Sequence, residues 1–295
     1  MELRGRGEKG YKRGDMNGTL PAELWGWITA WVGLAGLCIG SFLNVCAWRI
    51  PRGESVAWPG SHCPKCGHAL GLWDNIPVAS WVGLRGKCRY CREPISWRYP
   101  VGELLTAGVW LGVWWTHGWT WETAALLAVA SGLLAGAMID CEHYILPDRI
   151  TLGGIAAGLA LSWALPGLQG AAAGARWTGL GLSAASAALG AGILWLVGLA
   201  GKAAFKRDAM GLGDVKLLAA IGACLGWRAV LFTVLASSLT GTLLGVGLLA
   251  LGKREWSGRI PYGPHLALGA YVWMLWGSVL AAWYWGLAAG PGGVP

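Results

Sequence analysis

Long apolar stretches alternate with short polar connections along most of the chain. We interpret eight of these stretches as transmembrane helices, since a span needs roughly 20 mostly apolar residues. The second, third and sixth are short, and we expect them to lie tilted or to be shielded by their neighbours. The predicted spans are Leu24–Ala47, Val101–Trp115, Thr123–Ile139, Ile150–Leu165, Leu180–Leu199, Met210–Leu225, Ala229–Leu251 and His265–Leu287. The pattern therefore predicts an all-α polytopic membrane protein with about eight transmembrane helices.

One long polar segment, at residues 48–100, separates the first span from the second. The predicted organisation is a basic N-terminal tail (1–23), the first transmembrane helix (24–47), a small polar loop domain (48–100), a seven-helix membrane core (101–288) and a flexible C-terminal tail (289–295). The loop domain holds eight Lys and Arg residues against three Asp and Glu. Because positively charged loops stay in the cytoplasm, the sequence predicts that this loop is cytoplasmic and that both termini face outward.

The basic tail before the first span disagrees with this orientation. Five Lys and Arg residues precede Met16, although an even number of spans places the tail outside. A native start at Met16 would remove all five of them. We keep Met1 and Met16 as alternative starts of the native protein.

Composition supports a membrane protein and argues against nucleic-acid binding. The chain is 55% hydrophobic and only 13% charged, whereas soluble domains usually have about a quarter charged residues. The net charge of +8 comes from basic residues distributed among the loops. Interleaved aromatic and basic residues, which mark a nucleic-acid surface, are not found. We expect a lipid bilayer as a partner, and no nucleic acid.

Two Cys-x-x-Cys motifs in the polar loop predict a metal site. Twenty-one residues separate them, a spacing compatible with a tetrahedral zinc site of four thiolates. Disulfides or free thiols are the alternatives, and a cytoplasmic location argues against disulfides. With four protein ligands the zinc would be structural, because no position is left for a reactive water. The predicted ligands are Cys63, Cys66, Cys88 and Cys91.

Three of the six aspartates lie where predicted spans begin or end. Asp140 ends the third span, Asp148 precedes the fourth, and Asp214 begins the sixth, all on the predicted cytoplasmic side. Carboxylates in a membrane are candidates for function, although Asp148 also suits a helix N-cap or a first-turn acid. Gly211 and Gly213 would let another helix and an extended substrate approach Asp214. Two carboxylates held together share a proton, so that one activates water and the other polarises a peptide carbonyl.

These motifs together resemble the type 4 prepilin peptidases, which are bacterial Gly-x-Gly-Asp aspartyl membrane proteases. The resemblance rests on Gly40–Val45 with Arg49 and Pro51, both cysteine motifs, Asp74–Pro77, Ser96–Pro100 with Glu103, Asp140 with Pro147, Asp148 and Thr151, Gly211–Asp214 with Lys216, and Ile260–Pro264. It implies that Asp140 and Asp214 are the catalytic pair. It also implies cleavage of the basic leader of prepilins and pseudopilins, substrates of type IV pilus and type II secretion systems, at the cytoplasmic face of the bacterial inner (plasma) membrane.

The resemblance further implies a second activity. Many members N-methylate the newly exposed residue with S-adenosylmethionine, and the four-cysteine loop resembles these bifunctional members. No Gly-rich strand-turn-helix for the methyl donor is present in the sequence, so its binding residues are not assigned. Two alternatives stay open at this point: a leader peptidase without methylation, and a non-enzymatic membrane adaptor or transporter with a zinc docking loop.

Overall fold

The computed structural model describes residues 21–206, 210–252 and 260–289. Apart from two isolated β-bridges, the regular structure of these ranges is helical. The eight long helices are α1 (Ala22–Arg49), α3 (Arg98–His117), α4 (Trp121–His143), α5 (Asp148–Ala164), α6 (Arg176–Phe205), α7 (Leu212–Leu225), α8 (Trp227–Ala250) and α9 (Gly263–Ala289). Most of the predicted N-terminal tail, with Met16, and most of the predicted C-terminal tail lie outside the described residues.

Among the described residues, five helices are long and apolar enough to cross a membrane, namely α1, α4, α6, α8 and α9. Helices α3, α5 and α7 are not in this set, and α5 and α7 have only 17 and 14 residues. Each of the eight predicted spans nevertheless corresponds to one long helix. The prediction of an all-α membrane protein is confirmed, and the number of eight crossings stays a prediction.

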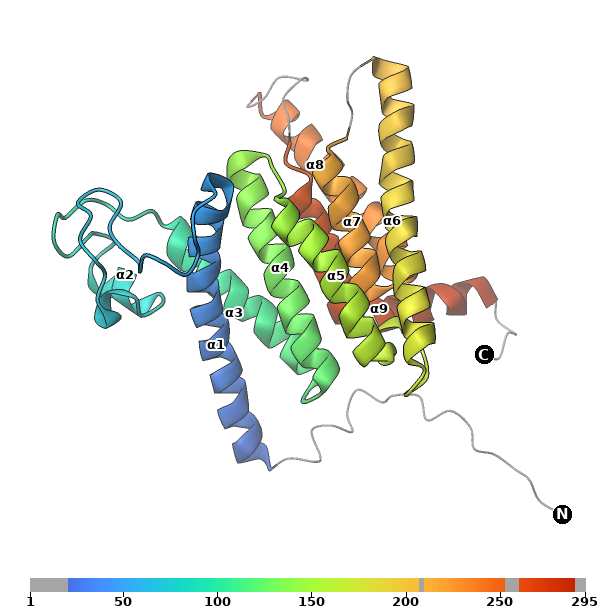
Figure 1. Cartoon of the computed structure of the whole chain (residues 1–295), viewed down its shortest axis with the longest axis horizontal. Helices are drawn as coiled ribbons and strands as arrows, with labels where there is room; N and C mark the ends of the chain where they lie inside the picture. The colour runs from blue at the N-terminus through green and yellow to red at the C-terminus, as the bar shows by residue number, and fades with distance from the viewer. Residues whose placement is uncertain (1–20, 207–209, 253–259, 290–295) are drawn as a thin grey trace.

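The short helix α7 lies in the middle of the bundle, in contact with α5, α6, α8 and α9 (Figure 1). Every residue from Leu217 to Cys224 is buried. Near the end of α7, Ser162, Ser183 and Gln169 all donate hydrogen bonds to the carbonyl oxygen of Ala223. Such polar contacts and close packing hold helices together in lipid. The neighbours therefore shield this short helix, as the sequence led us to expect.

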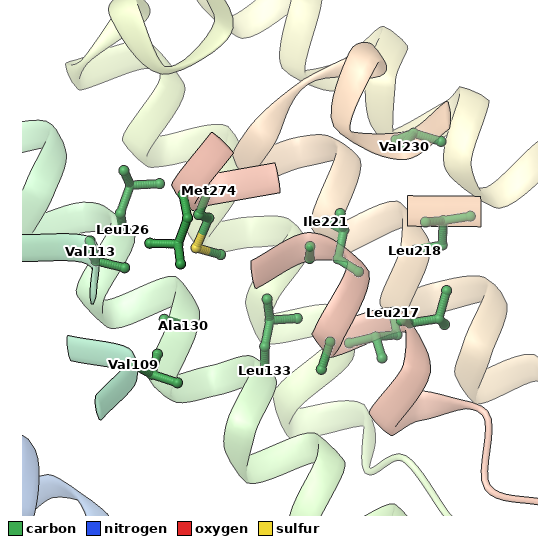
Figure 2. Close-up of a cluster of buried hydrophobic side chains, with 14 of the residues drawn as sticks. Val109, Val113, Leu126, Ala130, Leu133, Leu217, Leu218, Ile221, Val230 and Met274 are labelled. Atoms are coloured by element: carbon green, nitrogen blue, oxygen red, sulfur yellow. The ribbon is translucent and has the colours of Figure 1, made fainter. Parts of the chain in front are cut away.

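The main hydrophobic core fixes α4 relative to α7 and α9. Figure 2 shows Val113 from α3, Leu126 and Leu133 from α4, Ile221 from α7 and Met274 from α9 gathered in one cluster. Well-packed interiors resist displacement of one element relative to another. Helices α4, α7 and α9 carry the residues at the predicted active site, so this core determines how those residues meet.

The N-terminal part of the fold is the pair formed by α1 and α3, with the polar loop beside it (Figure 1). The helices approach closely because a Cβ atom at residue 40 would lie 2.6 Å from the Cα of Glu103, a distance only Gly40 permits. The loop contains η1 (Ile50–Arg52), η2 (Leu72–Asp74) and α2 (Ala79–Gly83). It is slightly shorter than the predicted 48–100, since α1 continues to Arg49 and α3 begins at Arg98.

Candidate active site and metal centre

Asp140 lies in the last turn of α4, and its position is fixed by the start of α9. The residue is only 5% exposed. Its Oδ2 accepts a hydrogen bond of 2.9 Å from the backbone amide of Gly263. Among the described residues, no other hydrogen-bond donor to this carboxylate is found. A Cβ atom at residue 263 would come within 2.8 Å of the same oxygen. Glycine is therefore required for α9 to begin against Asp140, a role that we did not predict from the Ile260–Pro264 motif.

Asp214 is the third residue of α7, and its carboxylate turns back toward the start of the helix. A Cβ atom at Gly211, the N-cap residue, would lie 3.1 Å from its Oδ2, so the carboxylate lies beside the N-terminal backbone of α7, as the acid of a capping box does. This contact alone would make Asp214 a structural cap. The negative charge of Asp140 also acts on Asp214. A like charge nearby disfavours the ionised carboxylate that a helix cap requires, so a purely capping role does not explain this arrangement. The fold thus brings together the two aspartates that the sequence singled out.

A close contact between α7 and the α4–α5 connection sets this arrangement. A Cβ atom at residue 213 would lie 2.9 Å from the Cβ of Leu146, which in turn packs against Gly136, one turn before Asp140. Gly213 therefore lets α7 begin beside the end of α4. Gly211 leaves room for the Asp214 carboxylate, whose Oδ2 would be 3.1 Å from a Cβ atom at residue 211. Both glycines of the Gly-x-Gly-Asp motif have a structural explanation.

Asp148 has a different environment from this pair. It is an exposed residue in the first turn of α5, and its Oδ1 accepts a hydrogen bond of 2.6 Å from the Nζ of Lys216. Pro147 occupies the N-cap position, and the cap has no side-chain hydrogen bond. Of the two structural roles expected for Asp148, the first-turn acid is the one observed. The ion pair joins the start of α5 to the second turn of α7.

Four cysteine side chains converge in the polar loop. The Sγ atoms of Cys63, Cys66, Cys88 and Cys91 all lie within 4.8 Å of one another, and those of Cys63 and Cys91 are 3.8 Å apart. All four are free thiols, so the structure does not bear out the disulfide alternative. A tetrahedral site with zinc–sulfur bonds of about 2.3 Å places its sulfurs about 3.8 Å apart. The donor set and its spacing fit a zinc ion.

The two cysteine motifs have the same backbone conformation. The amides of Cys63 and Cys88 each donate to the carbonyl oxygen five residues later, at 2.9 Å. The residues that follow the motifs, Gly67 and Arg92, both have positive φ, of 71° and 61°. Two backbone amides of its own turn lower the pKa of the Cys88 thiol to about 7. In Cys91 the lowering by the Glu93 amide is outweighed by burial and the three neighbouring thiols, which raise the pKa to about 12. Cys88 is therefore the thiol that most readily takes the thiolate form, which is the form that binds metals.

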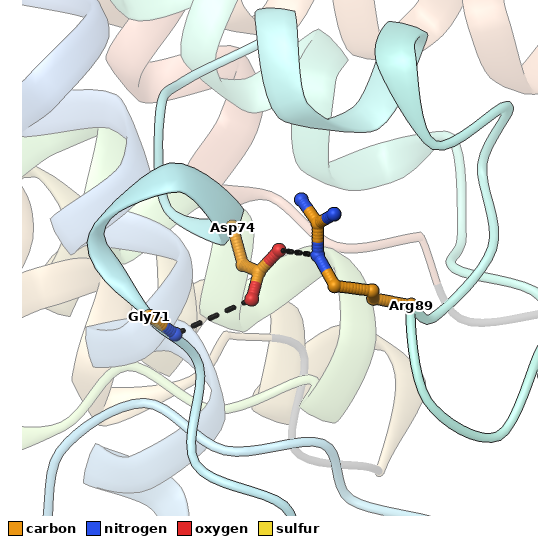
Figure 3. Close-up of polar contacts among 3 residues, drawn as sticks. All are labelled: Gly71, Asp74 and Arg89. Carbon is orange, nitrogen blue, oxygen red and sulfur yellow. Dashed lines mark hydrogen bonds and ion pairs between the residues drawn. The ribbon is translucent and has the colours of Figure 1, made fainter.

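An ion pair joins the second cysteine motif to the rest of the loop (Figure 3). The Nε of Arg89 donates to the Oδ1 of Asp74 at 2.7 Å, and the amide of Gly71 donates to its Oδ2 at 3.3 Å. The guanidinium keeps the pKa of Asp74 below its usual value. Asp74 is therefore ionised at neutral pH, and the stability that its ion pair contributes is lost as the pH falls through this lowered pKa.

Two buried charged residues hold the polar loop against the helices. Arg49, only 6% exposed, donates to three backbone carbonyls between residues 55 and 60. Glu103 is 7% exposed, and its Oε2 accepts a hydrogen bond of 2.7 Å from the amide of Val78. Both residues belong to the motifs of the family resemblance, but we did not predict their structural roles. A charged residue at the end of an apolar span is the signal that could have indicated them.

Comparisons with known proteins agree with these observations. Two family models match: the Bacterial Peptidase A24 N-terminal domain over residues 34–117 and the Type IV leader peptidase family over residues 126–246. Curated relatives called "Prepilin leader peptidase/N-methyltransferase" include proteins from Stutzerimonas stutzeri, Aeromonas hydrophila and Pseudomonas aeruginosa, which are 37%, 38% and 37% identical. These alignments cover 84%, 85% and 85% of this chain and 91% of each relative. No solved structure gives a significant match. The chain therefore belongs to the type IV leader peptidase family.

Proposed function

We propose that this protein cleaves the leader peptides of prepilins and pseudopilins with Asp140 and Asp214, and then N-methylates the new N-terminus. The observation that carries the proposal is the pairing of two carboxylates where α4 ends and α7 begins, with Asp140 oriented by the Gly263 amide. Relatives named for both activities support it. Membership of a peptidase family favours this function over a non-enzymatic adaptor or transporter.

In the proposed mechanism the two carboxylates share one proton. The ionised one removes a proton from water as the water oxygen attacks the carbonyl carbon of the scissile peptide bond, and the protonated one donates to the carbonyl oxygen. When the intermediate collapses, the carbon–nitrogen bond breaks and the leaving amine receives a proton. The Gly263 amide holds Asp140 in one orientation throughout. The N-terminus of α7, which carries a partial positive charge, favours negative charge at Asp214.

We assign the two non-protein groups to different tasks. Zinc bound by the four cysteines would be structural, because four thiolates fill a tetrahedral site and metal binding would fold a loop with little core of its own. S-adenosylmethionine would supply the methyl group. Neither takes part in the cleavage step, which needs only the two carboxylates and water.

We further propose that the polar loop and the aspartate pair face the cytoplasm of a bacterial inner membrane. The excess of basic residues in the loop supports this orientation. In a chain with Cys38 and Cys141 replaced by Ser, we expect a membrane-impermeant maleimide to label Arg52→Cys only after the cells are opened. Labelling of intact cells at this position would contradict the orientation and the proposed side of cleavage.

The function itself can be tested by mass spectrometry of the product. We expect purified protein in lipid nanodiscs, given a prepilin and S-adenosylmethionine, to release the leader and to add one methyl group to the new N-terminus. Cleavage without methylation would favour a leader peptidase that lacks the second activity. A prepilin that stays intact would contradict the proposed function.

The contact between Gly263 and Asp140 leads to a specific prediction. In Gly263→Ala the added methyl group meets the carboxylate oxygen at 2.8 Å, so either the start of α9 or Asp140 must move. A displacement of about 1 Å at a catalytic group can lower the rate roughly 100-fold, and we expect a loss of this order in the leader-cleavage rate. The matched control is Gly132→Ala in α4, the helix that carries Asp140, because a Cβ atom at residue 132 would meet nothing within 4 Å. Equal rates for the two variants would argue against the contact.

Asp148 should matter far less. In Asp148→Asn an exposed ion pair with Lys216 is weakened, and such pairs contribute about 0–1 kcal/mol. We therefore expect the cleavage rate to fall by less than about fivefold. The variant is compared with Asp140→Asn in the same assay. If Asp148→Asn is inactive while Asp140→Asn cleaves normally, Asp148 rather than Asp140 is the partner of Asp214.

A further inference from the structure

Two hydrogen bonds between side chains, one turn of α8 apart, tie the residues at the start of α9 to α8. The hydroxyl groups of Ser237 and Tyr262 are 2.7 Å apart, and the Nδ1 of His265 lies 3.1 Å from the Oγ1 of Thr240. Ser237 is fully buried. Neither bond takes part in the proposed cleavage step, so the mechanism leaves both unexplained.

The direction of each bond follows from the other contacts of the α8 hydroxyl groups. A serine or threonine hydroxyl has one proton to donate. Ser237 donates it to the carbonyl oxygen of Val234 at 3.1 Å, so Tyr262 is the donor to Ser237. Thr240 likewise donates to the backbone of its own helix at 2.9 Å, so the Nδ1 of His265 donates to Thr240. Two acceptors fixed on α8 therefore hold two donors at the start of α9.

Close packing further fixes α9 against α8. A Cβ atom at residue 269 would lie 3.2 Å from both the Cα and the carbonyl oxygen of Thr233, which is one turn before Ser237. The Tyr262 side chain also packs against the main hydrophobic core. Interiors packed this closely resist displacement of one element relative to another. The position of α8 therefore determines where α9 begins.

The hydrogen bond from Gly263 to Asp140 depends on how α9 begins. The first amides of a helix have no acceptor within it. In α9, Pro264 has no amide proton, and the next two amides donate to the carbonyl oxygen of Tyr262. Gly263 therefore supplies the amide that reaches Asp140, at 2.9 Å. Because Tyr262 and Gly263 share a peptide bond, a displacement of Tyr262 moves this amide directly.

We propose that Ser237 is a positioning residue for leader cleavage, which acts through the Tyr262 hydroxyl to hold the Gly263 amide against Asp140. The inference rests on the proposed function. Because Ser237 is fully buried in the helix bundle, it acts through Tyr262 rather than on the substrate. The Gly263 amide fixes the orientation of the Asp140 carboxylate, and such a hydrogen bond also stabilises the ionised form. That is the form that removes a proton from water in the proposed mechanism.

Two substitutions remove this contact from opposite sides. Tyr262→Phe removes the donor, and Ser237 keeps its bond to Val234. Ser237→Ala removes the acceptor. We expect each to lower kcat for leader cleavage about tenfold, less than the roughly 100-fold cost of a displacement of about 1 Å, and to change KM by less than about twofold. The double variant should be no slower than the slower single variant, because both remove the same bond.

The matched control is Ser183→Ala in α6. Ser183 is also fully buried, and it donates a hydrogen bond of 2.7 Å to the carbonyl oxygen of Ala223. That oxygen still accepts from Ser162 and Gln169 in the variant, so a comparable bond is lost far along α7 from Asp214. We expect kcat to stay at the wild-type value. An equal loss of kcat in Ser183→Ala would show that loss of any buried hydrogen bond slows cleavage, and would overturn the positioning role.

One NMR signal reports the Gly263 amide independently of cleavage. Tyr262 and Gly263 form the only Tyr-Gly pair in the sequence. The full chain in nanodiscs, with ¹³C in the tyrosine carbonyls and ¹⁵N in glycine, therefore gives a single carbonyl–amide correlation. We expect its amide proton resonance to move in Ser237→Ala in the same direction as in Asp140→Asn, which weakens the acceptor. In Ser183→Ala it should stay where it is in the wild-type chain.

Zinc content and a single sharp signal show that each variant is folded. A Gly263 signal and a kcat that are both unchanged in Ser237→Ala would overturn the inference. A signal that moves while kcat keeps its wild-type value would overturn it as well, since the contact would then exist without a role in cleavage. If the wild-type chain does not cleave a prepilin, the proposed function itself fails, and a signal that moves then supports only the contact.

Discussion

Replacement of Asp214 by asparagine is expected to lower the leader-cleavage rate by roughly 10³- to 10⁴-fold, the upper range for loss of general acid–base catalysis. Asparagine has nearly the same shape as aspartate, so α7 should begin where it does now. What it lacks is a proton that can be exchanged with the partner carboxylate. The rate is measured with a prepilin in nanodiscs, at enzyme excess, so that product release does not mask the chemical step.

Asp140→Asn should behave in the same way, since its side-chain oxygen can still accept from Gly263. The control is Asp74→Asn, which removes a carboxylate from the polar loop and leaves the pair at the end of α4 untouched. This variant should cleave at nearly the wild-type rate. Folded Asp214→Asn protein that still cleaves normally would remove the proposed mechanism.

Replacement of Cys63 by serine is expected to remove most of the bound zinc. Structural zinc sites bind with apparent free energies of roughly 10–16 kcal/mol, and loss of one of four thiolates leaves an incomplete site. Because Cys63 is buried between the two motifs, the polar loop should loosen and become sensitive to proteolysis. Zinc per chain, measured by elemental analysis, should fall from about one to well below one.

The matched control is Cys38→Ser, an exposed residue of α1 that lies outside the cluster. This variant should keep its zinc and its resistance to proteolysis. Asp74→Asn should give an intermediate result, because it releases Arg89 but leaves all four thiols in place. Wild-type protein with little zinc and four freely titratable thiols would contradict the metal assignment.

The helices could be predicted from sequence because each is a long apolar run between polar residues. Their ends were less certain: α6 runs from Arg176 to Phe205, well beyond the predicted Leu180–Leu199. The convergence of the four cysteines was also predictable, since the spacing within each motif is a local property. The turn after the second motif was harder to predict. Its residue of positive φ is Arg92, whereas the first motif has Gly67 at this position, and glycine is the usual sign of such a turn.

The remaining features depend on contacts between distant segments. Gly263 meets Asp140 across 123 residues of sequence, and neither local pattern indicates the other. The same is true of Glu103 and Val78, which become neighbours only when the loop folds against α3. Counting spans along the sequence predicted that Asp140 and Asp214 lie on one side of the membrane. The fold places the end of α4 beside the start of α7, since Leu146 packs against both Gly136 and Gly213. The role of the two aspartates as the catalytic pair stays a prediction.

The most direct test compares the leader-cleavage rates of Asp140→Asn, Asp214→Asn and the double variant under single-turnover conditions. If the two aspartates act as one unit, removal of the second carboxylate costs almost nothing after loss of the first. The predicted result is a double variant within about threefold of either single variant, with zinc content unchanged in all three. A double variant slower by the product of the two single losses would show independent contributions and contradict the shared-proton pair.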